Sequence, residues 1–178
     1  TTTVAATGAL SGCSDHGESR MPKPPQAVMG PDGVQRLPWQ NWSGYRHCLP
    51  GARVAPNTVD EMAEFLKLAK TTVRPVGAGH SFTELVPTDG GILVSLRNFS
   101  GLLSHDAAAL TATFGSGTRL GDVGEPLDKV GQAMPNMPDI DEQTLAGAMS
   151  TGTHGTGQKL GALHSQLKAL KLVTPKGD

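Results

Sequence analysis

Hydrophobic and polar positions follow no regular period over residues 1–38, which are rich in Pro, Gly, Ser and Thr. This composition predicts a tail and linker, with the folded part beginning near Trp39. The first clear helical period follows Thr58, which opens the capping-box sequence Thr-Val-Asp-Glu. The apolar positions on one face of that helix are Met62, Phe65, Leu66 and Ala69. We therefore predict a helix over about residues 58–70.

Short apolar runs after this helix predict strands that alternate with further helices. The predicted strands are residues 73–76, 92–96, 110–114 and 167–174. A second amphipathic helix has its apolar face at Leu120, Val123, Leu127 and Val130. Its expected stop is Gly131, and residues 144–149 are apolar enough for a short buried helix. The turn sequence at residues 176–178 normally leads into another strand, so we expect a fold that is incomplete at its C-terminal end.

Composition and charge narrow the classes of partner. The chain has 15 Lys and Arg against 16 Asp and Glu, and this formal net charge of -1 argues against nucleic-acid binding. The sequence contains no run of 18 apolar residues, the length that a membrane-spanning helix needs. A chain of 178 residues has room for one domain, and its 23 Gly and 13 Pro indicate that loops carry the function.

The two cysteines, Cys13 and Cys48, match no metal-site spacing and define no disulfide framework. Leu10-Ser11-Gly12-Cys13 follows a small, mildly apolar stretch and resembles a bacterial lipoprotein processing site. We therefore expect a lipid anchor at Cys13 and a periplasmic or membrane-anchored location on the exported side. The alternative is a disordered tail that happens to contain a cysteine.

Two loops of small residues, 77–81 and 150–157, each carry a histidine. Phe82 stands where a nicotinamide-binding fingerprint has its third glycine, and Gln158 separates Gly157 from the following lysine, so neither a Rossmann site nor a phosphate loop is matched. Both loops nevertheless let backbone N–H groups approach an anion such as a pyrophosphate. The simpler interpretation is that each loop is only a tight turn.

Four ordered motifs carry a family resemblance that covers residues 41–178. They are residues 76–82 (Val-Gly-Ala-Gly-His-Ser-Phe), 136–141 (Asn-Met-Pro-Asp-Ile-Asp), 143–148 (Gln-Thr-Leu-Ala-Gly-Ala) and 150–157 (Ser-Thr-Gly-Thr-His-Gly-Thr-Gly). This set resembles the vanillyl-alcohol oxidase superfamily, in particular the aldonolactone and alditol oxidases. The resemblance implies an α+β fold, a two-subdomain FAD-binding domain of the PCMH type, over residues 39–178.

The resemblance also implies which residues form the site. The cofactor-binding residues that it implies are Val76, Gly77, Ala78, Gly79, His80, Ser81, Phe82, Thr144, Gly147, Ala148, Met149, Ser150 and Gly152. His80 corresponds to the histidine that the family bonds to the 8α-methyl group of the flavin. Asp139 and Pro138 are expected near the isoalloxazine ring, and no metal site is expected.

The implied activity is that of an FAD-dependent oxidase acting on a CH–OH group of a sugar-derived lactone or polyol. Proline at position 138 favours O2 as the electron acceptor, whereas alanine there accompanies dehydrogenases in the family. The Asp139-Ile140-Asp141 sequence favours a lactone. The family places its substrate domain and its base C-terminal to this region. Two alternatives stay open: a non-catalytic flavin-binding fragment that needs a partner chain, and a periplasmic sugar-binding module without flavin.

Overall fold

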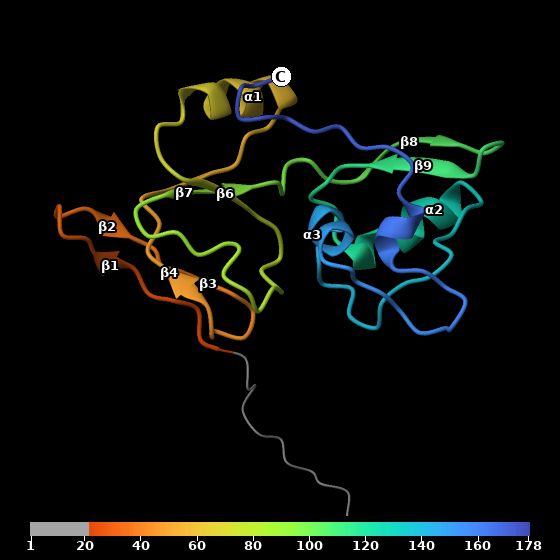
Figure 1. The fold of residues 1–178 in the computed structure, drawn as a ribbon, viewed down its shortest axis with the longest axis horizontal. Coiled ribbons are helices and arrows are strands. Elements are labelled where there is room, and N and C mark those ends of the chain that lie inside the picture. Colours follow the sequence, from red (N-terminus) through yellow and green to blue (C-terminus); the bar gives the residue numbers. More distant parts are fainter. Residues whose placement is uncertain (1–21) are drawn as a thin grey trace, which may run out of the picture.

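The computed structural model describes residues 22–178, in two lobes that lie side by side (Figure 1). The first lobe holds the elements from β1 (Val28–Met29) to β7 (Ile92–Ser95), and the second holds those from β8 (Leu102–Asp106) to the last helical turn, η2 (Leu163–Gln166). The chain then returns across the top of the view to the first lobe, where Gly177 lies against Ala63 and Lys67 of helix α1 (Val59–Leu68). The predicted anchor at Cys13 lies outside the described residues.

The centre of the first lobe is a parallel sheet with the strand order β5-β7-β6, formed by Ala52–Val54, Ile92–Ser95 and Val73–Val76. The middle strand is the most buried, with Leu93 and Val94 each 2% exposed. Helix α1 (Val59–Leu68) connects β5 to β6, as parallel strands require. Thr58 caps it by accepting a hydrogen bond from the backbone N–H of Glu61 at 3.0 Å. The predicted helix and the predicted strands at 73–76 and 92–96 are thereby confirmed.

Two small hairpins precede this sheet. The first pairs β1 (Val28–Met29) with β2 (Gln35–Arg36), and the second pairs β3 (Trp39–Gln40) with β4 (His47–Cys48), both antiparallel. Residues 28–36, which we predicted to belong to the linker, thus form a hairpin, and an Asp32–Arg36 ion pair at 2.6 Å closes it.

The second lobe contains the β8 (Leu102–Asp106) and β9 (Thr111–Phe114) hairpin, packed beside short helical turns. Those turns are η1 (Leu120–Asp122), α2 (Gly124–Lys129), α3 (Leu145–Ser150) and η2 (Leu163–Gln166). The predicted helix at 120–130 is therefore divided into a 3-10 turn and an α-helix, because Gly121 and Gly124 disfavour a continuous helix. Gly131, at φ +70°, ends it as predicted.

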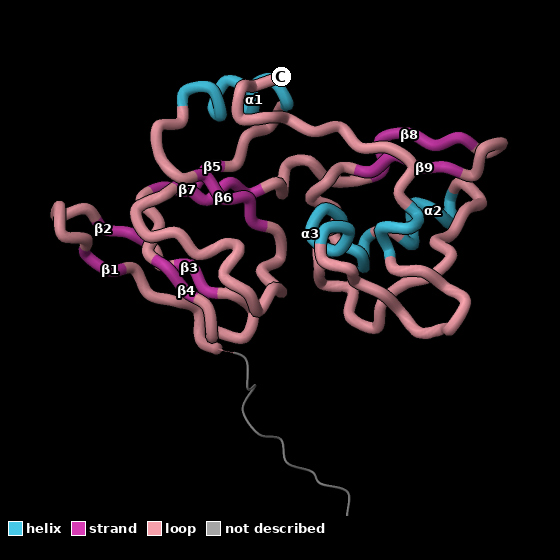
Figure 2. Tube along the Cα trace, viewed as in Figure 1, coloured by secondary structure: helices cyan, strands magenta, loops and turns pink. Residues whose placement is uncertain are grey.

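Loops and turns make up most of residues 22–178, as Figure 2 shows. The strand predicted over residues 167–174 is wrong, because this segment runs as irregular chain with no strand alongside it among residues 22–178. Its Leu170 and Leu172 side chains stay 68% and 71% exposed. None of the helices within residues 22–178 is both long enough and apolar enough to cross a membrane.

Candidate functional site

The first glycine loop begins directly at the end of β6 and is packed closely on two sides. A Cβ atom at Gly77 would overlap the Thr144 Oγ1 atom at the start of α3. Gly79 has a φ of +74°, and a Cβ atom there would lie 3.3 Å from Cζ2 of Trp39. Both positions therefore require glycine. At Gly77 the reason is space, and at Gly79 it is both space and the positive φ.

The turn between β3 and β4 holds the backbone of this loop through three hydrogen bonds. The Trp42 backbone N–H donates to the Gly79 carbonyl at 3.1 Å, and the Asn41 side-chain amide donates to the Ser81 carbonyl at 3.1 Å. The Arg46 guanidinium donates to the Phe82 carbonyl at 2.9 Å. Asn41 is only 2% exposed, so its side chain lies in the interior of this contact.

His80 lies half-buried on the indole of Trp42. The two ring centroids are 5.4 Å apart and the planes differ by 9°, which is a parallel stack. Partial burial lowers the pKa of His80 below its ordinary value of 6.5; the negative charge of Glu142 opposes this shift and the positive charge of Arg119 adds to it. His80 therefore carries a neutral imidazole at neutral pH.

A pocket of about 200 Å³ lies where the first glycine loop meets the second lobe. Its lining residues are Val76, Gly77, Ala78, Ser95, Leu96, Arg97, Gly117, Arg119 and Thr144. Arg119 pairs with Glu142 at 2.5 Å, whereas Arg97 makes no ion pair within residues 22–178. Two guanidinium groups beside two glycines suit an anionic group such as a pyrophosphate.

The second glycine loop does not line this pocket. It packs instead on residues 136–137, where a Cβ atom at Gly155 would overlap the Met137 carbonyl oxygen. His154 is exposed, and its Nδ1 lies 2.8 Å from the Gly155 carbonyl oxygen. Of the predicted residues in this loop, Ser150 donates to the Ala146 carbonyl and Gly152 adopts a φ of +67°.

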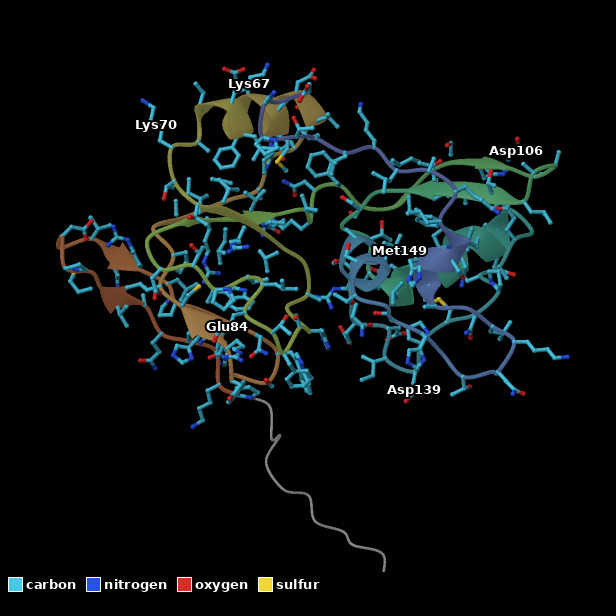
Figure 3. All side chains as sticks on the ribbon, in the orientation of Figure 1. Lys67, Lys70, Glu84, Asp106, Asp139 and Met149 are labelled. Carbon is cyan, nitrogen blue, oxygen red and sulfur yellow. The ribbon has the colours of Figure 1, made fainter. Side chains whose placement is uncertain are left out.

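The remaining predicted residues have different surroundings. Ala148 is fully buried in a cluster with Leu120 and Leu163, and Met149 packs against that cluster in the middle of the second lobe (Figure 3). Their side chains thus belong to the core. Pro138 is half-buried, and Asp139 is exposed at the lower edge of the second lobe in Figure 3. No group of three His, Cys, Asp or Glu side chains within residues 22–178 is arranged to hold a metal ion.

The sequence prediction of this site missed Trp42, Arg97, Arg119 and Glu142. Each comes from an element distant in sequence from the first loop, so no local motif connects them. Only Trp42 could have been found from the sequence, because the chain has two Trp residues and both fall within residues 39–42. Large aromatic side chains placed so close together in such a glycine-rich chain mark an anchoring point.

Comparison with known families and proteins shows which kind of domain this is. A family model described as an FAD binding domain matches residues 50–178. L-gulono-1,4-lactone dehydrogenase of Mycobacterium tuberculosis is 34% identical over 79% of this chain and 33% of its own length. Bovine L-gulonolactone oxidase is 34% identical over 82% of this chain and 33% of its own length. D-arabinono-1,4-lactone oxidase of Kluyveromyces lactis is 33% identical over 79% of this chain and 28% of its own length.

Solved structures support the same fold. Cholesterol oxidase from B. sterolicum aligns with a TM-score of 0.55 at 21% identity, over 76% of this chain and 27% of that one. Alkyldihydroxyacetonephosphate synthase aligns with a TM-score of 0.56 at 20% identity, over 67% of this chain and 23% of that one. The chain thus spans about a third or less of the proteins that it matches.

The described residues also fit the cofactor of this family. Gly77 leaves no room for a side chain in the pocket wall, and the arginines at positions 97 and 119 offer positive charge. An adenine dinucleotide carries the anionic groups that suit these charges. The chain belongs to the FAD-binding domain family, and its domain is of the PCMH type found in the vanillyl-alcohol oxidase superfamily.

Proposed function

We propose that this protein is an FAD-dependent oxidoreductase that oxidises a CH–OH group of a sugar-derived lactone and passes the electrons to O2. Three relatives named for aldonolactone substrates, at 33–34% identity, favour a lactone over a polyol. In this proposal the substrate site is supplied from outside residues 22–178, by more of the same polypeptide or by a partner chain.

The observation that carries the proposal is the pocket at the junction of the two lobes. Gly77 and Ala78 line its wall with small residues that leave the backbone accessible, and Arg97 and Arg119 bring positive charge. These groups bind and orient the dinucleotide, whereas hydride chemistry is supplied by the flavin when it is bound. Thr144 closes the pocket from the second lobe, so both lobes contribute to one binding surface.

The proposal includes a covalent bond between His80 and the flavin. His80 follows the loop glycine Gly79 and carries a neutral imidazole, which has the free electron pair that a nucleophile needs. One N–C bond forms to the 8α carbon of the flavin. This bond would replace one C–H bond of the 8α-methyl group and the N–H bond of the imidazole, and the two protons and two electrons released would reduce O2 to H2O2.

Flavin binding is tested first, by the absorption spectrum and Kd of the purified protein with FAD. Arg97→Gln and Arg119→Gln are each expected to weaken FAD binding about tenfold, since each removes a charge-assisted contact worth roughly 1.5 kcal/mol. Arg74→Gln is the matched control, because Arg74 is exposed on β6 and does not line the pocket. Equal affinities in all three variants would contradict the assignment of this pocket.

Activity is tested by adding aldono-1,4-lactones and measuring H2O2. Turnover by the chain alone would show that it contains its own substrate site. Stable flavin binding without turnover would favour the alternative, a flavin-binding portion that depends on a partner chain. A protein that binds no flavin would leave only the sugar-binding interpretation.

We also propose that the protein is exported and lipid-anchored through Cys13. This rests on the Leu-Ser-Gly-Cys sequence and the proline-rich spacer that follows it. Radiolabelled palmitate should label the wild-type protein, whereas a Cys13→Ala variant should stay unlabelled. Recovery of an unlabelled wild-type protein from the cytosol would contradict this location.

A further inference from the structure

We propose that Trp42 is a positioning residue for His80, because its indole fixes the plane of the imidazole for flavin attachment. This inference rests on the covalent bond proposed for His80, with the same balance of one N–C bond formed and two hydrogens passed to O2. The observation behind it is the parallel stack, with centroids 5.4 Å apart and planes within 9°.

An imidazole in this position needs such a partner. His80 follows Gly79, whose φ of +74° places the loop in a conformation that leaves the ring half outside the protein. A ring with two free torsions would otherwise populate several staggered rotamers. The indole covers one imidazole face and so removes most of those alternatives.

Trp42 is itself fixed relative to the loop. Its backbone N–H donates to the Gly79 carbonyl, one residue before His80, at 3.1 Å. Phe82, two residues after His80, meets the indole edge-on with centroids 5.6 Å apart at 78°. The indole and the imidazole are therefore tied to the same four-residue stretch, which limits their relative motion.

The exposure of Trp42 argues against a purely structural role. Its side chain keeps 36% of its surface in water, although tryptophan stabilises a fold chiefly through the area it buries. Trp42 is also uncharged, so it adds no net charge beside the imidazole. The charged groups that act on His80 are Glu142 and Arg119, both from the second lobe and of opposite sign.

The test compares Trp42→Ala, Trp42→Leu and Trp42→Phe in the full chain incubated with FAD. The readout is the flavin that stays on the polypeptide after acid precipitation, measured over time. Alanine and leucine are expected to slow attachment at least about tenfold, since loss of orientation alone has effects of that size. Phenylalanine keeps an aromatic face and should restore most of the rate. Tyr45→Ala, an exposed aromatic on the same turn, is the matched control.

A second readout does not depend on flavin. The stacked indole should shift the His80 ring protons upfield in the NMR spectrum of the free protein, and the shift should vanish in Trp42→Leu. Attachment at the wild-type rate in Trp42→Leu, or an unshifted His80 in the wild type, would overturn the positioning role. A wild-type protein whose flavin is all released by acid instead refutes the covalent bond itself. Should Trp42→Ala not fold, the comparison of leucine with phenylalanine decides.

Discussion

Replacement of Gly77 by alanine is the sharpest test of how the first loop meets the second lobe. The added methyl carbon would overlap Thr144 Oγ1 and would lie 3.3 Å from both Cβ and Cγ2 of Thr144. A β-branched side chain has few rotamers with which to retreat, so the loop or α3 must shift. Overpacking of this kind costs about 1–3 kcal/mol. Because the strain falls in the pocket wall, we expect FAD affinity to drop about tenfold as well.

A double-mutant cycle separates this collision from other effects. Thr144→Ala removes the overlapping Oγ1 and the Cγ2, so Gly77→Ala/Thr144→Ala should recover most of the stability, with a coupling of about 1–2 kcal/mol. Gly124→Ala is the control, because a Cβ atom at Gly124 meets nothing within 4 Å. Urea unfolding gives the stabilities and fluorescence titration gives the FAD affinities. A Gly77→Ala protein as stable as the wild type, or no rescue by Thr144→Ala, would refute the close packing.

Three further predictions concern the loop and its surroundings. Asn41→Ala leaves the Ser81 carbonyl without its buried donor and should lower the free energy of unfolding by about 1–3 kcal/mol, measured by urea denaturation. His80 has a lowered pKa in the folded state, so the unfolded state binds more protons below pH 6.5. The free energy of unfolding of the wild type should therefore decrease as the pH is lowered below 6.5. A His80→Gln variant should lack this part of the pH dependence. Pro138→Ala should slow reoxidation of the reduced protein by O2 in stopped-flow measurements, because an alanine methyl can fill the space that O2 needs; an unchanged rate would remove Pro138 from the control of O2 access.

Local patterns in the sequence predicted those elements whose signals lie within a few residues. Thr58 and Glu61 define the cap of α1, and the run at 73–76 leads straight into a glycine loop. The hairpins before β5 escaped prediction because their strands are two residues long and have no alternation to detect. The strand predicted at 167–174 is absent for a different reason. The segment is rich in apolar residues, but a strand also needs a neighbour to hydrogen-bond with.

The candidate site was predictable to a similar extent. Motif order singled out Gly77, which lines the pocket, because a glycine loop after a strand is a local feature. The role of His80 stays a prediction. The partners of that loop were not predictable, since the β3–β4 turn and the Arg119–Glu142 pair reach it only through the tertiary fold. The motifs also included Ala148, whose side chain serves the core of the second lobe. A motif thus marks a stretch of chain that a fold needs, without separating its packing residues from its binding residues.

The junction between the lobes explains why one pocket takes residues from both. The segment that leaves β7 passes directly under residues 115–118, where a Cβ atom at Gly117 would overlap the Leu96 carbonyl oxygen. Thr118, 2% exposed, accepts the Gly101 N–H across this contact and donates to the Gly115 carbonyl within its own segment. A ligand held by Gly77 and Thr144 at once interacts fully only while that contact is intact. With FAD in the proposed pocket, we expect FAD binding and lobe association to be linked, and FAD at about 100 times its Kd should raise the stability of the joined state by about 2.7 kcal/mol.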